Sequence, residues 1–240
     1  MVGKYVYEED KDPKGEEEMK RYTMRNRNAK ELIENLVGFE GLYKLEEHAV
    51  FTPDGYILIL HRLKFSDQMM YKRTFEFGKG LYQCRGGEDR PPVLLNHGAM
   101  MTSEAWLAAP HRIIPENEGD DSFGVPATLA HVLLHSGYDV WVANRRGNKY
   151  RCKHTHLSTL DREFWSFSLD EPACQDLPAV VDFIREFTEH EKVSLIGFSQ
   201  GAAETLAALS MVKGLERKVN LAILLAPTTK PGGKNNNVTS

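Results

Sequence analysis

Short apolar runs alternate with helix-like segments between residues 93 and 227, and this alternation restricts the fold more than any other feature of the sequence. The apolar runs occupy residues 93–96, 138–143, 193–196 and 219–225. They lack polar alternation, which is typical of strands buried on both faces of a sheet. Segments with helical periodicity lie between them, at residues 123–136, 171–188 and 202–212. We therefore predict an α/β fold with a mostly parallel sheet wrapped by helices.

An antiparallel N-terminal hairpin is expected ahead of this region. Strand-like runs at residues 44–51 and 56–63 flank the triplet Pro53-Asp54-Gly55. Proline fixes its own φ and glycine accepts a positive φ, so this triplet favours a tight turn. The hairpin would add antiparallel strands to one edge of the parallel sheet.

The chain divides by composition into an arm, one domain and a tail. Residues 1–28 are rich in Glu, Lys, Arg and Asn, so we predict a mobile polar arm. A single domain is predicted over residues 29–232, beginning with a short helix and including a surface loop at 65–92. Residues 233–240 read as a polar tail.

Composition excludes several classes of protein. The 240 residues include 30 Lys and Arg against 34 Asp and Glu, a net charge of −4, which argues against a nucleic-acid partner. No apolar run approaches the roughly 18 residues of a membrane helix, and the charged N-terminus lacks the apolar core of a secretory signal. Cys84, Cys152 and Cys174 are odd in number, match no metal spacing and are expected to be free thiols. The glycosylation sequon at Asn237 is discounted because it lies at the last residues of a sequence without an export signal.

The sharpest chemical motif is Gly197-Phe198-Ser199-Gln200-Gly201. The letters G-x-S-x-G alone are a weak signal, because about one chain in twelve of this length contains them by chance. Here, however, a strand-like run leads directly in and a helix-like run leads directly out. That setting is required for a nucleophile elbow, where a serine is exposed on a strained turn. The flanking Gly197 and Gly201 leave room where a Cβ would strike a neighbouring strand or helix. We predict Ser199 as a catalytic nucleophile.

A second motif, His97-Gly98-Ala99, follows the apolar strand at 93–96. Acyl transfer requires preorganised N–H groups that stabilise an oxyanion. In the fold with a nucleophile elbow, one donor follows the nucleophile and the other follows the third strand, which points to the N–H groups of Gln200 and Ala99 as the oxyanion hole. The His97 side chain is expected to hold the loop by hydrogen bonds rather than to react.

Taken together, the motifs resemble the acid lipase family of α/β-hydrolases, and within it the fungal steryl ester and triacylglycerol hydrolases. The carrying segments are HAVFTPDGYILILHRL, PPVLLNHGAMMTSEAW, GYDVWVANRRGNKY, FWSFSLDEPACQDLPAVVDFI, VSLIGFSQGAAETLAALS and LAILLAP. They follow the family's order and make residues 29–232 a partial α/β-hydrolase domain. The resemblance implies a serine carboxylic-ester hydrolase of lipid catabolism that acts on neutral lipid esters and needs no cofactor or metal. It also implies association with a lipid-droplet or membrane surface inside the cell.

The sequence departs from the family pattern in two ways. Family members usually have a bulkier apolar residue where Ala99 stands, so the N–H is kept while the pocket wall differs. The chain also stops soon after residue 225. We expect the C-terminal strands, the lid and the triad Asp and His to lie outside these residues, because in this fold acid and base follow the serine. All nine histidines precede Ser199.

Two other functions remain open. One is a catalytically inactive lipid-binding or regulatory relative, and the other is an esterase for small soluble esters. A truncated chain is expected neither to fold well alone nor to hydrolyse esters efficiently.

Several further residue sets favour structural readings. His154 and His156 with Cys152 match no common zinc spacing. The basic turn at residues 144–148 has no phosphate-loop spacing. The aromatic run 164–167 is expected to pack, and contact with a lipid substrate is the alternative if the run lies near the site. Three acidic side chains near residue 171 are expected to cap and charge the N-terminal turn of the following helix, namely Asp170, Glu171 and Asp176.

Overall fold

The computed structural model describes residues 43–66, 90–108, 112–113, 125–126, 128–150 and 153–229. The expected arm, the first helix, most of the surface loop and the polar tail lie outside the described residues. Cys84, Cys152 and the sequon at Asn237 also lie outside them.

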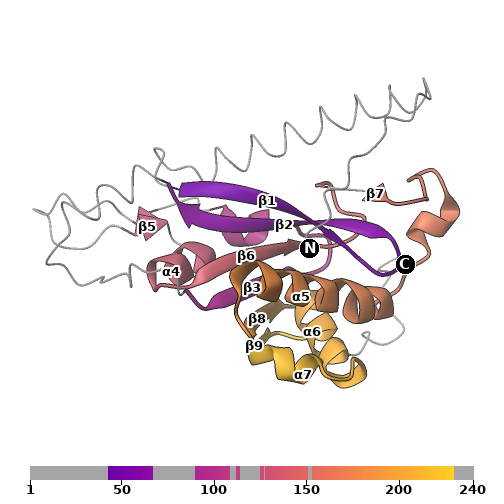
Figure 1. Cartoon of the computed structure of the whole chain (residues 1–240). Coiled ribbons are helices and arrows are strands. Elements are labelled where there is room, and N and C mark those ends of the chain that lie inside the picture. Colours follow the sequence, from indigo (N-terminus) through magenta and orange to yellow (C-terminus); the bar gives the residue numbers. More distant parts are fainter. Residues whose placement is uncertain are drawn as a thin grey trace, which may run out of the picture.

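A mixed sheet forms the centre of the described chain (Figure 1). In spatial order its strands are β1 (Tyr43–Phe51), β2 (Tyr56–Phe65), β6 (Asp139–Asn144), β3 (Pro92–Asn96), β8 (Val193–Phe198) and β9 (Val219–Leu225). The first two pairings are antiparallel, and the remaining ones, from β6 to β9, are parallel. The predicted fold class is thereby confirmed, including the antiparallel hairpin at one edge.

The hairpin turn forms as the triplet predicts. Gly55 has a φ of +95°, which only glycine adopts readily. Thr52 accepts a hydrogen bond from the Tyr56 N–H through its side chain at 2.9 Å and donates to Asp54. A short strand, β7 (Lys153–His154), pairs with the start of β2 next to this turn.

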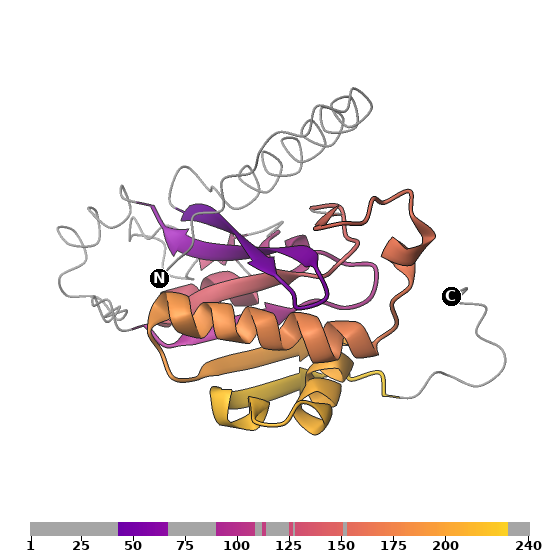
Figure 2. The ribbon, with the colours of Figure 1, turned by 45° about the vertical axis from the view of Figure 1, so that its right-hand side comes forward.

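Helices cover both faces of the sheet. One face packs against α5 (Leu177–Thr188), α6 (Gln200–Met211) and α7 (Leu215–Lys218). The other packs against α3 (Glu104–Leu107) and α4 (Leu129–His135). Figure 2 shows α5 in front of the sheet, running roughly along its parallel strands. The central strands β3 and β6 are buried on both faces, as their apolar runs predict.

Helix α4 begins later than the sequence pattern indicates. The periodicity predicts a helix from residue 123, but Val125–Pro126 is a short strand, β5, paired with β4 (Arg112–Ile113). Proline disfavours the α conformation in the residue before it, which excludes Val125 from a helix. Thr128 then caps α4, because its side chain accepts a hydrogen bond from the His131 N–H.

The helix predicted at residues 171–188 contains a π-helical segment, η3 (Pro172–Asp176), ahead of α5. The Leu177 N–H donates to the Pro172 carbonyl, five residues back. Pro178 has no N–H and cannot complete the α-helical ladder at this point. The apolar face of α5 is buried as predicted except at Phe187, which is 47% exposed and packs on Phe183.

Strand β9 is the outermost parallel strand of the described sheet. Leu221, Ile223 and Leu225 point to one face and are 39–53% exposed. The apolar pattern alone predicts burial on both faces, but where the next strands and helices lie outside these residues the strand is expected to be an exposed apolar edge. No described helix covers that face of β9, and the exposure agrees with the second expectation. Among the described residues, no helix has the length and hydropathy needed to cross a membrane.

Candidate active site

Ser199 lies at the junction between β8 and α6, so the predicted strand–turn–helix setting is confirmed. Its backbone has a φ of 53° and a ψ of −114°, a conformation that costs a residue other than glycine about 1–3 kcal/mol. The Ser199 N–H donates to the Leu225 carbonyl at 2.9 Å, so the end of β9 helps to hold the turn. The residue is half-buried. A strained turn with an accessible serine is the geometry of a nucleophile elbow.

The glycines on either side of Ser199 occupy positions where a larger residue does not fit. A Cβ on Gly197 would lie 2.7 Å from the Ala202 backbone. A Cβ on Gly201 would lie 2.5 Å from the Asn96 carbonyl oxygen and 2.6 Å from that of His97. Helix α6 therefore approaches the end of β3 more closely than any side chain would permit.

The loop after β3 lies directly beside Ser199. A Cβ added to Gly98 would lie 3.2 Å from the Ser199 Cβ, and equally close to Phe198 and to the Met101 sulfur. Gly98 is buried, whereas Ala99 and Met100 are exposed. The fold thus brings together two motifs that are separated by about 100 residues in the sequence.

Backbone donors for an anion are available at this position. Gln200 is the first residue of α6, and the first N–H groups of a helix have no partner within the helix. Those groups also lie at the positive end of the helix dipole. Ala99 follows the buried Gly98 on the adjacent loop. The assignment of Ala99 and Gln200 as oxyanion donors stays a prediction, which this placement supports.

The His97 side chain points into the protein. Its Nδ1 lies 2.8 Å from the Gly98 carbonyl oxygen, which can only accept, so Nδ1 carries the proton. Its Nε2 accepts from the Arg145 N–H at 3.4 Å. Burial, together with the nearby Arg145 charge, lowers the pKa of His97 to about 4. The imidazole is therefore neutral at neutral pH and holds the loop, the role expected for it.

Beneath this loop lies a buried ion pair that sequence reasoning missed. Arg145 Nε lies 2.8 Å from Glu204 Oε1, and their side chains are 11% and 3% exposed. Arg145 also donates to the His97 carbonyl at 2.9 Å, and Glu204 accepts from Asn96. Burial raises the pKa of Glu204, against the opposing effect of Arg145. A glutamate inside the small, apolar stretch after Ser199 is the sequence signal that could have indicated this pair.

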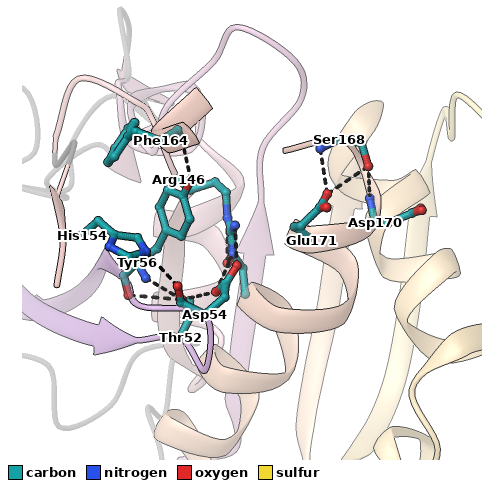
Figure 3. A network of polar contacts seen from close by, with 10 residues as sticks. Thr52, Asp54, Tyr56, Arg146, His154, Phe164, Ser168, Asp170 and Glu171 are labelled. Carbon is teal, nitrogen blue, oxygen red and sulfur yellow. Dashed lines mark hydrogen bonds and ion pairs between the residues drawn. The ribbon is translucent and has the colours of Figure 1, made fainter. Parts of the chain in front are cut away.

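Arg146, the next residue, serves a different region (Figure 3). Its guanidinium donates to both carboxylate oxygens of Asp176 at 3.0–3.1 Å through Nε, and to Asp54 at 2.7 and 3.1 Å. It also stacks 3.9 Å from the centre of the Tyr56 ring. The basic turn is therefore structural, as predicted. Asp176 does not cap the helix: the prediction was wrong because this side chain is buried and pairs with Arg146.

The remaining acidic and aromatic residues behave only in part as the sequence indicates. Glu171 accepts from the N–H and hydroxyl of Ser168, which precedes the helix (Figure 3), and its side chain makes no capping hydrogen bond to the helix, so the predicted cap is not formed. Phe164, in the 3-10 helix η2 (Arg162–Trp165), is fully buried and accepts a hydrogen bond from the Tyr56 hydroxyl. Trp165 is 48% exposed, so the aromatic run packs only in part.

The other described histidines support structure away from the elbow. His154 Nε2 contacts the Asp54 carbonyl at 2.8 Å, and its Nδ1 accepts from the backbone N–H of His156. His48 packs among Trp141 and the aromatic side chains of α5. Within the residues that the structure describes, no cluster of three or more His, Cys, Asp or Glu has the arrangement of a metal site.

A second serine also contacts a histidine. Ser103 Oγ lies 2.9 Å from His61 Nδ1, and His61 Nε2 lies 3.8 Å from a Glu47 carboxylate oxygen. The sequence gives no hint of this Ser–His–Glu array. Ser103 is fully buried, so a substrate cannot reach its hydroxyl. This array is therefore structural, and it anchors the far end of the loop that begins at His97.

Two family models match the sequence. Residues 40–110 match the partial alpha/beta-hydrolase lipase region, and residues 91–238 match the alpha/beta hydrolase fold. The chain belongs to the α/β-hydrolase family. The fold of this α/β-hydrolase is also similar to that of a naproxen esterase from Bacillus subtilis, with a TM-score of 0.50 at 17% identity over 86% of this chain and 50% of the esterase.

Curated relatives confirm the resemblance to acid lipases. A probable lipase of Schizosaccharomyces pombe is 42% identical over 81% of this chain. Human lipase member M is 35% identical over 81%, and mouse gastric triacylglycerol lipase is 34% identical over 85%. This α/β-hydrolase chain spans 37%, 39% and 44% of the length of these three relatives, respectively.

Proposed function

We propose that this α/β-hydrolase chain carries the nucleophile and oxyanion hole of a serine carboxylic-ester hydrolase that acts on neutral lipid esters, either steryl esters or triacylglycerols. The observation that carries the proposal is the strained, accessible Ser199 held against the loop at Gly98. Relatives named lipases, one of them a triacylglycerol lipase, support the reaction class and the lipid substrate.

The reaction follows from this placement. The Ser199 hydroxyl attacks the ester carbonyl while a histidine, which we expect outside the described residues, accepts its proton. The N–H groups of Ala99 and Gln200 stabilise the oxyanion of the tetrahedral intermediate. The C–O bond to the alcohol then breaks, and the alcohol leaves with the proton held by the histidine. Water hydrolyses the acyl-serine by the same steps in reverse order and regenerates Ser199.

Apolar side chains beside the elbow support a lipid substrate. Met100 is fully exposed and Met101 is 40% exposed, and both belong to the loop that contacts Ser199. Unbranched, polarisable side chains adapt to the irregular shape of an acyl chain. We also propose that the protein works at a lipid-droplet or membrane surface, where such substrates accumulate.

The proposal is tested with the protein expressed from its complete gene, as Ser199→Ala and as the wild type. The matched control is Ser210→Ala, an exposed serine on the same helix. We expect Ser199→Ala to lose labelling by a fluorophosphonate probe, and its kcat to fall by on the order of 10⁶, the loss typical of a serine nucleophile. Undiminished turnover in Ser199→Ala would show that another residue is the nucleophile.

The substrate class is tested by comparing emulsified triacylglycerol, emulsified steryl ester and a short soluble ester. A lipid hydrolase prefers the emulsions, and its activity rises when an interface forms. Preference for the soluble ester without interfacial activity would instead indicate an esterase for small molecules. Absence of both labelling and turnover in the wild type would indicate a catalytically inactive relative.

A further inference from the structure

The ion pair between Arg145 and Glu204 connects three segments that meet beneath the elbow. Arg145 lies in the turn after β6, and its Nη2 donates to the His97 carbonyl at 2.9 Å. Glu204 lies in the first turns of α6 and accepts from Asn96 Nδ2, at the end of β3, at 3.2 Å. Glu204 also accepts from the Gln200 side chain at 3.3 Å. The pair therefore contacts His97, two residues before Ala99, and the side chain of Gln200, whose N–H is the other proposed oxyanion donor.

Burial alone is weak evidence that this pair serves stability, so its contacts with the two elbow segments must indicate what it does. Removing two charges from water costs several kcal/mol per ion, and an apolar pair of similar volume is often at least as stable. Here the carboxylate is almost fully buried, and each partner makes further hydrogen bonds to backbone or side-chain groups. The donation from Arg145 Nη2 to the His97 carbonyl fixes direction as well as distance, because a guanidinium donates in a rigid planar fork, whereas Arg145 Nε and Glu204 form a close ion pair without hydrogen-bond geometry.

The relative position of the two oxyanion donors depends on contacts between distant segments. The two oxyanion donors lie on segments about 100 residues apart, so only tertiary contacts fix one relative to the other. The close approach of Gly201 to the Asn96 and His97 carbonyls limits how near the segments come. The Arg145–Glu204 pair holds the same segments together and limits how far apart they move. A displacement of about 1 Å at a catalytic group is enough to reduce a rate by about 100-fold.

We propose that Arg145 and Glu204 are positioning residues that align the Ala99 N–H with the Gln200 N–H, so that both donors reach the oxyanion in the transition state. This inference rests on the proposed esterase function. The two residues act through the His97 carbonyl and the first turn of α6, and neither contacts substrate.

The first test uses variants that change the pair with little change in volume, in the protein expressed from its complete gene. In Glu204→Gln the charge is lost, and in Arg145→Lys the planar fork is lost. We expect kcat to fall about 10- to 100-fold in Glu204→Gln and by a smaller factor in Arg145→Lys, with KM within about twofold. The affinity for a trifluoromethyl ketone, which forms an oxyanion on the serine, should fall in parallel with kcat. Wild-type kcat and analogue affinity in both variants would overturn the proposal.

Exchanging the two charges distinguishes a role in positioning the oxyanion donors from a role only in stabilising the fold. The double variant Arg145→Glu with Glu204→Arg restores an ion pair, but a glutamate at position 145 cannot donate to the His97 carbonyl. We expect the melting temperature to recover relative to each single exchange while kcat stays low. Recovery of kcat together with the melting temperature would show that the pair only stabilises the fold. If the exchanged protein does not fold, Arg145→Lys and Glu204→Gln still decide the matter.

Two controls complete the design. Arg146→Lys changes the adjacent buried arginine, whose partners lie at the hairpin and η3, so we expect a lower melting temperature with kcat within about twofold. An equal loss of kcat in Arg146→Lys would contradict a specific role for Arg145. Ser199→Ala separates the two hypotheses, since turnover that survives in Ser199→Ala refutes the proposed function. Turnover that disappears in Ser199→Ala but persists in the Arg145 and Glu204 variants refutes only the positioning role.

Discussion

Arg145 and Arg146 are neighbours in the sequence and are both largely buried, yet they belong to two different regions of the molecule. Arg145 binds Glu204 and the His97 carbonyl in the elbow region, next to Ser199. Arg146 binds Asp54 and Asp176 in the hairpin region (Figure 3). The first region contains a residue in a strained conformation, whereas in the second both carboxylates converge on one cation. The comparison indicates that one buried arginine positions the segments around Ser199, as proposed above, whereas its neighbour stabilises the fold.

The largest expected effect lies in the hairpin region. Arg146→Met leaves the buried Asp176 without its partner, and breaking a buried pair from one side costs about 3–5 kcal/mol of unfolding free energy. The measurement is denaturant unfolding with Arg217→Met as control, since Arg217 is 87% exposed and its loss should cost less than about 0.5 kcal/mol. A loss below about 1 kcal/mol in Arg146→Met would remove the contrast between the regions.

Acidification should weaken the elbow region through His97. Burial lowers the pKa of both His97 and His131 to about 4, so below pH 6.5 the unfolded chain binds protons that the folded chain does not. Each histidine therefore contributes fully to the free energy of unfolding above about pH 6.5, and this contribution is lost as the pH falls toward 4. Between pH 7 and pH 5 we expect a loss of about 1–2 kcal/mol per histidine.

The variants His97→Asn and His131→Asn check this assignment. Each should flatten part of the pH dependence of the melting temperature. The two parts should add because the contacts of His97, with Gly98 and Arg145, differ from those of His131, with Thr128 and Tyr43. An unchanged slope in His97→Asn would show that His97 does not cause the acid sensitivity.

The close approach in the elbow region predicts that Gly201→Ala lowers stability less than Arg146→Met does. The added Cβ must displace the Asn96 and His97 carbonyls, and such overpacking costs about 1–3 kcal/mol. Because the displaced segment carries Ala99, kcat of Gly201→Ala should fall as well. Arg146→Met, in contrast, should lower the free energy of unfolding while leaving kcat nearly unchanged. The comparison is made below both melting temperatures, with Ser210→Ala as control. A stable Gly201→Ala protein would show that the two segments separate at little cost.

The smallest effect concerns the strain at Ser199. Glycine normally destabilises a folded position relative to alanine, but at a φ of 53° and ψ of −114° it relieves strain. We therefore expect Ser199→Gly to be about 1 kcal/mol more stable than Ser199→Ala in thermal unfolding. The reverse order would mean that the elbow is not strained.

The order of elements is predictable from the sequence because it depends on local patterns. The apolar runs predict β3, β6, β8 and β9, and the triplet at Pro53 predicts the hairpin. The departures arise where proline changes the backbone. Pro126 delays the start of α4, and Pro178 accompanies the π-helical segment before α5. Proline makes its effect through backbone hydrogen bonds and φ, which a hydrophobic pattern does not record.

The candidate site is predictable only where its residues are close together in the sequence. Ser199 and its flanking glycines form a contiguous motif, and His97-Gly98-Ala99 directly follows a strand. Asn96, Arg145 and Glu204 are far apart in the sequence and have no shared spacing, so no local pattern connects them. Their association depends on the order of β6, β3 and β8 in the sheet.

The sequence by itself determined the strand–turn–helix around Ser199 and the glycines that permit it, because turn chemistry and periodicity act over a few residues. Tertiary structure alone decided which arginine serves the elbow and which serves the hairpin, and whether an apolar strand is buried. Strands β6 and β9 have similarly apolar sequences, yet β6 is central and buried whereas β9 lies at the edge and is half exposed. Burial depends on what packs against a strand, and those neighbours come from distant parts of the chain.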